Sequence, residues 1–146
     1  MSLYSEIILA HNNLPFHFEK KPDAQFIFEA YNPMCGDKFK IYLNIETEII
    51  NEIFFHGYGC AVSKAATSVL IKKIFGKNIS EAKNIIKKFF IILEKEFDIK
   101  NSEEKNIFTN EEIFAFHTVI NFPERKTCAT LSWEAMNNFL ANTYNQ

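Results

Sequence analysis

Hydrophobic and polar residues alternate along residues 24–57, and this alternation predicts three β-strands. The clearest run is 38–46. One side of this run carries Phe39, Ile41, Leu43 and Ile45, and the other carries Lys38, Lys40, Tyr42 and Asn44. Strict alternation is typical of a strand with one buried face. Residues 24–31 and 49–57 have the same character, and their short connections predict an antiparallel meander.

The hydrophobic period changes to that of helices on either side of this region. Residues 2–14 predict a first helix with Leu3, Ile7 and Leu14 on one face. After residue 59 the spacing predicts a helix that ends at Gly76 and a second helix, capped by Ser80, through residue 97. A shorter helical segment follows near residues 110–120. The last helix begins either at Pro123 or near Thr127, and the pattern leaves both starts open.

The order of these elements predicts an α+β fold. An N-terminal helix, a three-stranded antiparallel sheet and several helices packed on it would form one domain over residues 1–146. A hydrophobic fraction of 47% is enough for one core, and a net charge of -2 gives no reason to expect nucleic acid or an anionic membrane as a partner. The first residues lack the features of a signal peptide, and the longest apolar run, 89–93, is too short to span a membrane.

The three cysteines, with one neighbouring acid, are the candidate chemistry of the chain. Cys35, Cys60 and Cys128 are odd in number and widely separated, so we expect a reduced, cytoplasmic protein without a disulfide framework. Cys35 and Asp37 precede a strand, while Cys60 and Cys128 lie near predicted helix starts, where thiolates are favoured. Three thiolates and a carboxylate suit Zn²⁺ or Fe, but free cysteines are also common as small core side chains.

Three motifs around these cysteines resemble one protein family. The stretches "NPMCGD", "GYGCAVSKAATSVL" and "RKTCATLSWEA" are similar to the iron–sulfur cluster assembly family of SufU, IscU and the N-terminal part of NifU. The resemblance extends over about residues 3–140. It implies that Cys35, Asp37, Cys60 and Cys128 surround one metal or cluster site.

Details of the third motif favour the SufU type. In the IscU type a histidine precedes the last cysteine, whereas Thr127 stands there in this chain. Sixty-eight positions separate Cys60 from Cys128, which resembles the insertion of SufU proteins. We expect residues 77–120 to form a helical hairpin beside the site. The nearby Arg125 either orients the site, binds a partner or is a plain surface charge, and His56 is a weaker candidate ligand.

The resemblance implies a zinc-bound sulfur acceptor that takes persulfide sulfur from a PLP-dependent, SufS-like cysteine desulfurase and serves downstream iron–sulfur proteins. Cys35 is the implied acceptor, while Asp37, Cys60 and Cys128 complete the zinc shell. Whether this makes the protein an enzyme, a zinc-dependent sulfurtransferase, is left open. The first alternative is a scaffold that assembles and transfers a [2Fe–2S] cluster, with Fe in place of zinc. The second, of another class, is a zinc-stabilised interaction domain without sulfur chemistry.

Overall fold

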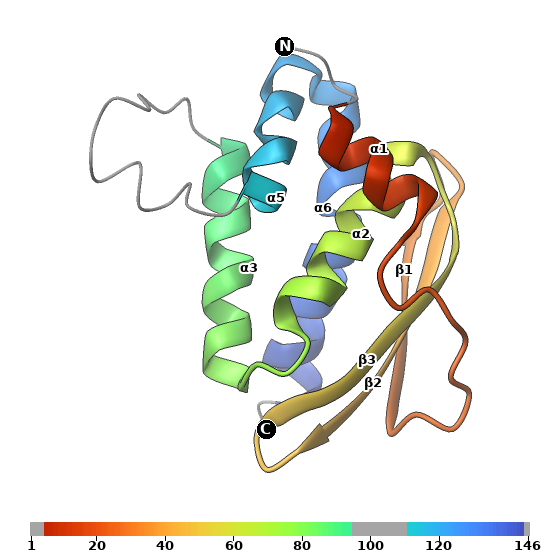
Figure 1. Ribbon diagram of the computed structural model, residues 1–146, viewed down its shortest axis with the longest axis vertical. Helices are drawn as coiled ribbons and strands as arrows, with labels where there is room; N and C mark the ends of the chain where they lie inside the picture. Colours follow the sequence, from red (N-terminus) through yellow and green to blue (C-terminus); the bar gives the residue numbers. More distant parts are fainter. Residues whose placement is uncertain (1–4, 95–110, 145–146) are drawn as a thin grey trace.

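The computed structural model describes residues 5–94 and 111–144 and has the predicted α+β architecture (Figure 1). Its elements, in chain order, are α1 (Glu6–Asn13), β1 (Phe26–Asn32), β2 (Asp37–Glu46), β3 (Ile49–Tyr58), α2 (Ala61–Ile74), α3 (Ile79–Glu94), α5 (Glu111–Phe114), the 3₁₀ segment η1 (Ala115–Asn121), α6 (Pro123–Asn138) and the π-helical segment η2 (Phe139–Tyr144). The N-terminal helix, the three-stranded sheet and the later helices confirm the fold class.

The three strands form one antiparallel sheet in the order β1-β2-β3. As the alternation predicts, Phe39, Ile41 and Leu43 are buried on the inner face, while Lys40 is exposed on the outer face. The outer edge of β3 is covered by residues 17–19, whose backbone exchanges hydrogen bonds with Phe55. This cover satisfies backbone groups that would otherwise remain open at a sheet edge.

Helices cover one face of the sheet in two layers (Figure 1). Helices α2 and α6 pack on the sheet, and α3 and η1 pack on the opposite side of this helix pair. Trp133 of α6 is fully buried between the layers, donates its indole N–H to the Ala66 carbonyl at 2.9 Å and stacks on Phe89 at 3.7 Å between ring centroids. No helix within the described ranges is both long and apolar enough to cross a bilayer.

Two of the predicted helix starts are corrected or decided by the structure. The helix α3 is capped by Asn78 and not by Ser80, because the Asn78 side chain accepts from the Glu81 N–H at 2.8 Å and Glu81 accepts from the Asn78 N–H at 3.2 Å. This reciprocal pair is a capping box. The predicted end of this helix, at residue 97, lies outside the described residues. Of the two starts left open for the last helix, Pro123 is the one observed.

The first helix turns a different face to the core than its pattern predicts. Ile8 is fully buried, whereas Leu14 is 87% exposed, and Leu3 lies outside the described residues. The reason is that α1 ends at Asn13, so the chain has already left the helix at Leu14.

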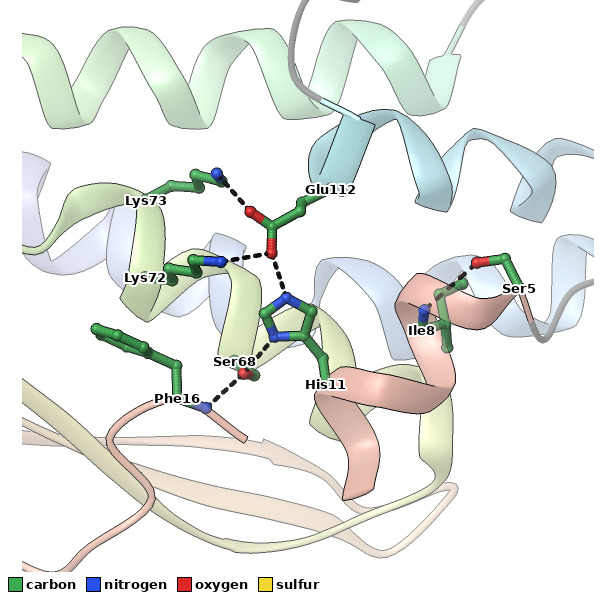
Figure 2. Close-up of polar contacts among 8 residues, drawn as sticks. All are labelled: Ser5, Ile8, His11, Phe16, Ser68, Lys72, Lys73 and Glu112. Carbon is green, nitrogen blue, oxygen red and sulfur yellow. Dashed lines mark hydrogen bonds and ion pairs between the residues drawn. The ribbon is translucent and has the colours of Figure 1, made fainter. Parts of the chain in front are cut away.

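A polar cluster ties α1 to α2 and α5 (Figure 2). His11 bonds the Ser68 hydroxyl at 2.7 Å through Nδ1 and the Glu112 carboxylate through Nε2. Glu112 also pairs with Lys72 at 2.9 Å and Lys73 at 2.6 Å, so both lysines have a carboxylate partner. Although burial raises the pKa of Glu112, hydrogen bonds from Lys73, His11 and Lys72 lower it to about 2.

This cluster contains a serine, a histidine and a carboxylate in hydrogen-bonded order, but it is not a hydrolase site. The Ser68 side chain is fully buried, and its oxygen accepts the Phe16 N–H at 2.7 Å. A nucleophile must reach a substrate carbonyl, which a fully buried hydroxyl cannot do. The cluster therefore serves to fix the loop after α1 against the helices.

Candidate functional site

Cys35 lies at the tip of the tight turn between β1 and β2, where its side chain is exposed. The turn is closed by a hydrogen bond from the Gly36 N–H to the Asn32 carbonyl at 2.8 Å. Gly36 has φ +76°, a left-handed conformation that favours glycine. Apart from its two chain neighbours, no described residue has an atom within 4 Å of the position that a Cβ would take there, so the turn requires this glycine and no close neighbour does.

Asp37 opens β2 and is only 3% exposed. One carboxylate oxygen, Oδ1, accepts the Cys60 N–H at 3.1 Å. The other, Oδ2, is buried and has no hydrogen-bond partner among the described residues. A buried oxygen without a partner costs about 1–3 kcal/mol. The site therefore holds an acceptor oxygen that a cation would satisfy.

Cys60 is the N-cap of α2, and its Sγ accepts the Ser63 N–H at 3.4 Å. The side chain is half-buried. The sulfur therefore lies beside the unpaired N–H groups at the start of the helix. The sequence-based expectation that Cys60 opens a helix is confirmed.

Cys128 lies in the second turn of α6 and not at its start, because the helix begins at Pro123. It is 1% exposed. Burial, followed by the neighbouring Cys60 and by Asp37, raises the pKa of the Cys128 thiol to about 12, while a hydrogen bond from Arg125 acts in the opposite direction. Cys128 therefore does not have the position at a helix start that was expected to favour a thiolate. Without a cation, the thiol keeps its proton at neutral pH.

The fold brings these four residues to one place from β2, the turn before it, α2 and α6. The ligand atoms of Cys35, Asp37 and Cys128 all lie within 4.8 Å of one another. Cys60 adjoins this group, since its N–H reaches Asp37 and its thiol hydrogen-bonds with Cys128, but its sulfur is outside the 4.8 Å set. The set thus offers thiol sulfur and carboxylate oxygen at one point, the donor types that zinc binds.

Two further candidates from the sequence have different positions. Arg125 contacts the site through its hydrogen bond to Cys128 and is therefore more than a surface charge. His56 lies on β3, where its ring stacks on Phe18 at 4.5 Å between centroids, and it is not in the set of converging ligand atoms.

Sequence reasoning overlooked three residues that shape the site. Asn32 donates its side-chain amide to the Cys35 sulfur at 3.5 Å, and Ser63 supplies the N–H that bonds Cys60. At Gly59 an added Cβ would meet the Phe39 ring at 2.9 Å and Asp37 Oδ1 at 3.0 Å, so only glycine fits there. The Asn-Pro pair before Cys35 and the "GYGC" stretch were the available signals.

Comparisons with known proteins found a matching family model and similar proteins. Residues 3–129 match the family model described as the NifU-like N-terminal domain. The zinc-dependent sulfurtransferase SufU of Bacillus subtilis is 30% identical over 141 residues, which are 96% of this chain and 90% of that protein. The iron–sulfur cluster assembly scaffold protein IscU of Thermotoga maritima is 29% identical over 138 residues, 94% of this chain and 92% of that protein.

A solved structure has the same fold. The crystal structure of a candidate iron–sulfur cluster assembly scaffold for the SUF system, from Fervidobacterium islandicum AW-1, is 34% identical. It aligns with a TM-score of 0.76 over 90% of this chain and 92% of that one.

Proposed function

Because the chain belongs to the family of the NifU-like N-terminal domain, we propose that it is an iron–sulfur cluster assembly protein that accepts sulfur at Cys35. The donor would be the persulfide of a PLP-dependent cysteine desulfurase, and iron–sulfur proteins would receive the sulfur downstream. The observation that carries this proposal is the position of Cys35. It is an exposed thiol whose sulfur lies within 4.8 Å of an Asp37 oxygen and of the buried Cys128 sulfur.

Zinc is the resident cation that these residues fit. The buried Oδ2 of Asp37, which has no hydrogen-bond partner among the described residues, supports this assignment. The three nearby thiols support it as well, and of these Cys60 is half-buried and Cys128 is buried. We propose Cys35, Asp37, Cys60 and Cys128 as the ligands. The name of the Bacillus subtilis relative, a zinc-dependent sulfurtransferase, supports the same metal. When bound, zinc keeps thiolates deprotonated and shields them from oxidation.

Sulfur acceptance at Cys35 needs no external oxidant. The Cys35 thiolate attacks the terminal sulfur of the donor persulfide, so a new S–S bond forms on Cys35 while the S–S bond of the donor breaks. The donor cysteine leaves as a thiolate and takes the electron pair of the broken bond. The Asn32 amide, 3.5 Å from the Cys35 sulfur, is placed to stabilise negative charge there.

The sulfur atoms of Cys60 and Cys128 are less accessible to the donor than that of Cys35. Cys128 is 1% exposed, so a protein-bound persulfide cannot reach it without rearrangement of α6. Cys60 is held by the N–H of Ser63 at the start of α2. Among the three cysteines, only Cys35 combines exposure with a position on a turn.

Mass spectrometry after incubation with a desulfurase and cysteine tests the assignment. We expect one added sulfur on the peptide that contains Cys35 in the wild-type protein, and none in Cys35→Ala. The matched control is Cys128→Ala, in which Cys35 should still gain sulfur if the fold is retained by circular dichroism. Added sulfur that maps to Cys128 and never to Cys35 would show that the proposed acceptor is wrong.

The runner-up function is a scaffold on which a [2Fe–2S] cluster is built as cargo. It is favoured by the scaffold names of the Thermotoga and Fervidobacterium relatives and by the thiol-rich donor set, which iron accepts as well. Protein purified without oxygen separates the two. Stoichiometric zinc that resists exchange for iron supports the relay, whereas a chromophore that transfers to an apo-ferredoxin supports the scaffold. The third alternative is an interaction domain without sulfur chemistry. In that case any increase in desulfurase activity on addition of the protein would be the same for wild type and Cys35→Ala.

A further inference from the structure

The outer face of the sheet carries a distinctive set of side chains at the end next to Cys35. The strand register arranges the outward-facing residues in rows across the sheet. From the site outward, these rows are Tyr31, Lys38 and Tyr58, then Glu29, Lys40 and His56, then Ile27, Tyr42 and Phe54. Within residues 5–94 and 111–144 no helix covers this face, since the helices pack on the opposite one (Figure 1).

The first row is continuous with the candidate site. Lys38 follows Asp37 in β2, and Tyr58 ends β3 two residues before Cys60. Tyr31 is 54% exposed, Tyr58 is 64% exposed, and Met34, beside Cys35 in the turn, is 91% exposed. Exposed tyrosine and methionine side chains are enriched at protein–protein interfaces. A protein that reaches Cys35 would therefore meet these side chains.

A groove of about 560 Å³ begins at this row and runs along the outer face. Its apolar lining includes Ile27 and Tyr58, and its polar lining includes Lys20, Lys40 and His56. A lining that combines apolar and cationic side chains suits a peptide segment that carries both apolar and acidic side chains.

The charge of the groove is opposite to that of the chain as a whole, which has a net charge of -2. Glu29 is the carboxylate that faces Lys38 at 3.8 Å and Lys40 at 4.0 Å, while Lys20 has no carboxylate within ion-pair distance among the described residues. Burial, with Lys20 and Lys64 nearby, lowers the pKa of His56, as expected where positive charges gather. Three lysines thus outnumber one acid beside the site.

We propose that this outer face is the docking surface for an acidic segment of the protein that donates sulfur to Cys35, an inference that rests on the proposed function. The lysines attract the segment, and Tyr31, Tyr58 and Met34 supply the apolar contact. Docking there brings the persulfide of the donor to the exposed turn and not to the helical side of the molecule. A positive surface mainly accelerates association and makes affinity depend on salt.

Charge reversal on this face tests the proposal. The test variant is Lys20→Glu with Lys40→Glu, and the matched control is Lys87→Glu with Lys88→Glu on α3, which changes the net charge equally on exposed positions of the helical side. Binding of the cysteine desulfurase from the same genome is measured by biolayer interferometry at 50 and 300 mM salt. The test variant should bind about tenfold more weakly at 50 mM salt and lose most of its salt dependence, while the control stays within about twofold of wild type.

Equal affinity of the test variant and wild type, equal losses in test and control, or no binding of wild type would each overturn the proposal. If Lys20→Glu with Lys40→Glu fails to fold, Lys20→Gln with Lys40→Gln is expected to give about half of the effect. Sulfur transfer from glutathione persulfide to Cys35 is measured in parallel. It should be unchanged in every variant, because this small donor does not need the docking surface. Failure of Cys35 to take sulfur from either the desulfurase or glutathione persulfide would refute the proposed function. The binding measurements test the docking surface independently of this result.

Discussion

The ion-pair cluster around Glu112 gives the fold a specific pH dependence, which the substitution Glu112→Gln should remove. Burial opposes the charge, but hydrogen bonds from Lys73, His11 and Lys72 outweigh it and lower the pKa of Glu112 from 4.5 to about 2 (Figure 2). A carboxyl group whose pKa is lowered on folding stabilises the protein at every pH above its unfolded value. That stability is lost as the pH falls from about 4.5 toward 2.

The size of this effect follows from the same values. A lowering of the pKa from 4.5 to about 2 corresponds to roughly 3 kcal/mol. The side chains of Lys72 and Lys73 are 43% and 20% exposed, so solvent screens part of the attraction. We therefore expect Glu112→Gln to lower the free energy of unfolding at pH 7 by about 1–2 kcal/mol. The melting temperature should fall by about 3–8 °C.

Urea unfolding of wild type and Glu112→Gln at intervals from pH 7 to pH 3 measures this difference. The difference in the free energy of unfolding should be constant between pH 7 and 5 and should shrink below pH 4.5. Below that pH the carboxyl group is protonated in the unfolded wild type, so the charged Glu112 stabilises the folded state less. The control is Glu134→Gln, an exposed glutamate on α6 that should change stability by less than about 0.5 kcal/mol. A difference that stays the same down to pH 3, or one no larger than the control, would refute the reasoning.

Three further predictions concern the site and the helix start. Asp37→Asn keeps the acceptor for the Cys60 N–H but removes the anionic oxygen. A competitive titration should therefore show zinc affinity about 10–100-fold weaker, and an unchanged affinity would contradict the ligand assignment. Gly59→Ala brings a Cβ to 2.9 Å from the Phe39 ring. The free energy of unfolding in urea should fall by about 1–3 kcal/mol, and metal analysis should show a lower zinc content. Wild-type values of both would contradict the close approach. Asn78→Ala should cost about 1 kcal/mol in urea unfolding, whereas Ser80→Ala should cost less than half as much, and the reverse order would contradict the capping assignment.

The sheet could be predicted from the sequence because one physical signal determines it. Phe39, Ile41 and Leu43 must face the core together, and a shift of one residue would expose all three. Helix starts are less determined. Asn78 and Ser80 are both good caps, and Asn78 is chosen because its side chain and backbone N–H both bond with Glu81.

The candidate site could be predicted only in part, because its geometry depends on contacts between distant segments. The cysteines stand out by type, but their environments depend on packing between distant segments. Burial of Cys128 depends on α6 beginning at Pro123, and the bond between Cys60 and Ser63 depends on a cysteine taking a capping role that Ser, Thr, Asp or Asn usually fills. The close approach at Gly59 depends on Asp37, which is more than twenty residues away in sequence. Local patterns carry none of these long-range contacts.

In the proposed function, four side chains from separate parts of the chain hold one zinc ion beside an exposed, sulfur-accepting thiol. X-ray absorption at the zinc edge, on protein purified with its metal, measures this directly. We expect a first shell of three sulfur atoms and one oxygen, with one sulfur fewer in Cys35→Ser. A shell of nitrogen and oxygen alone, or a spectrum that Cys35→Ser leaves unchanged, would contradict it.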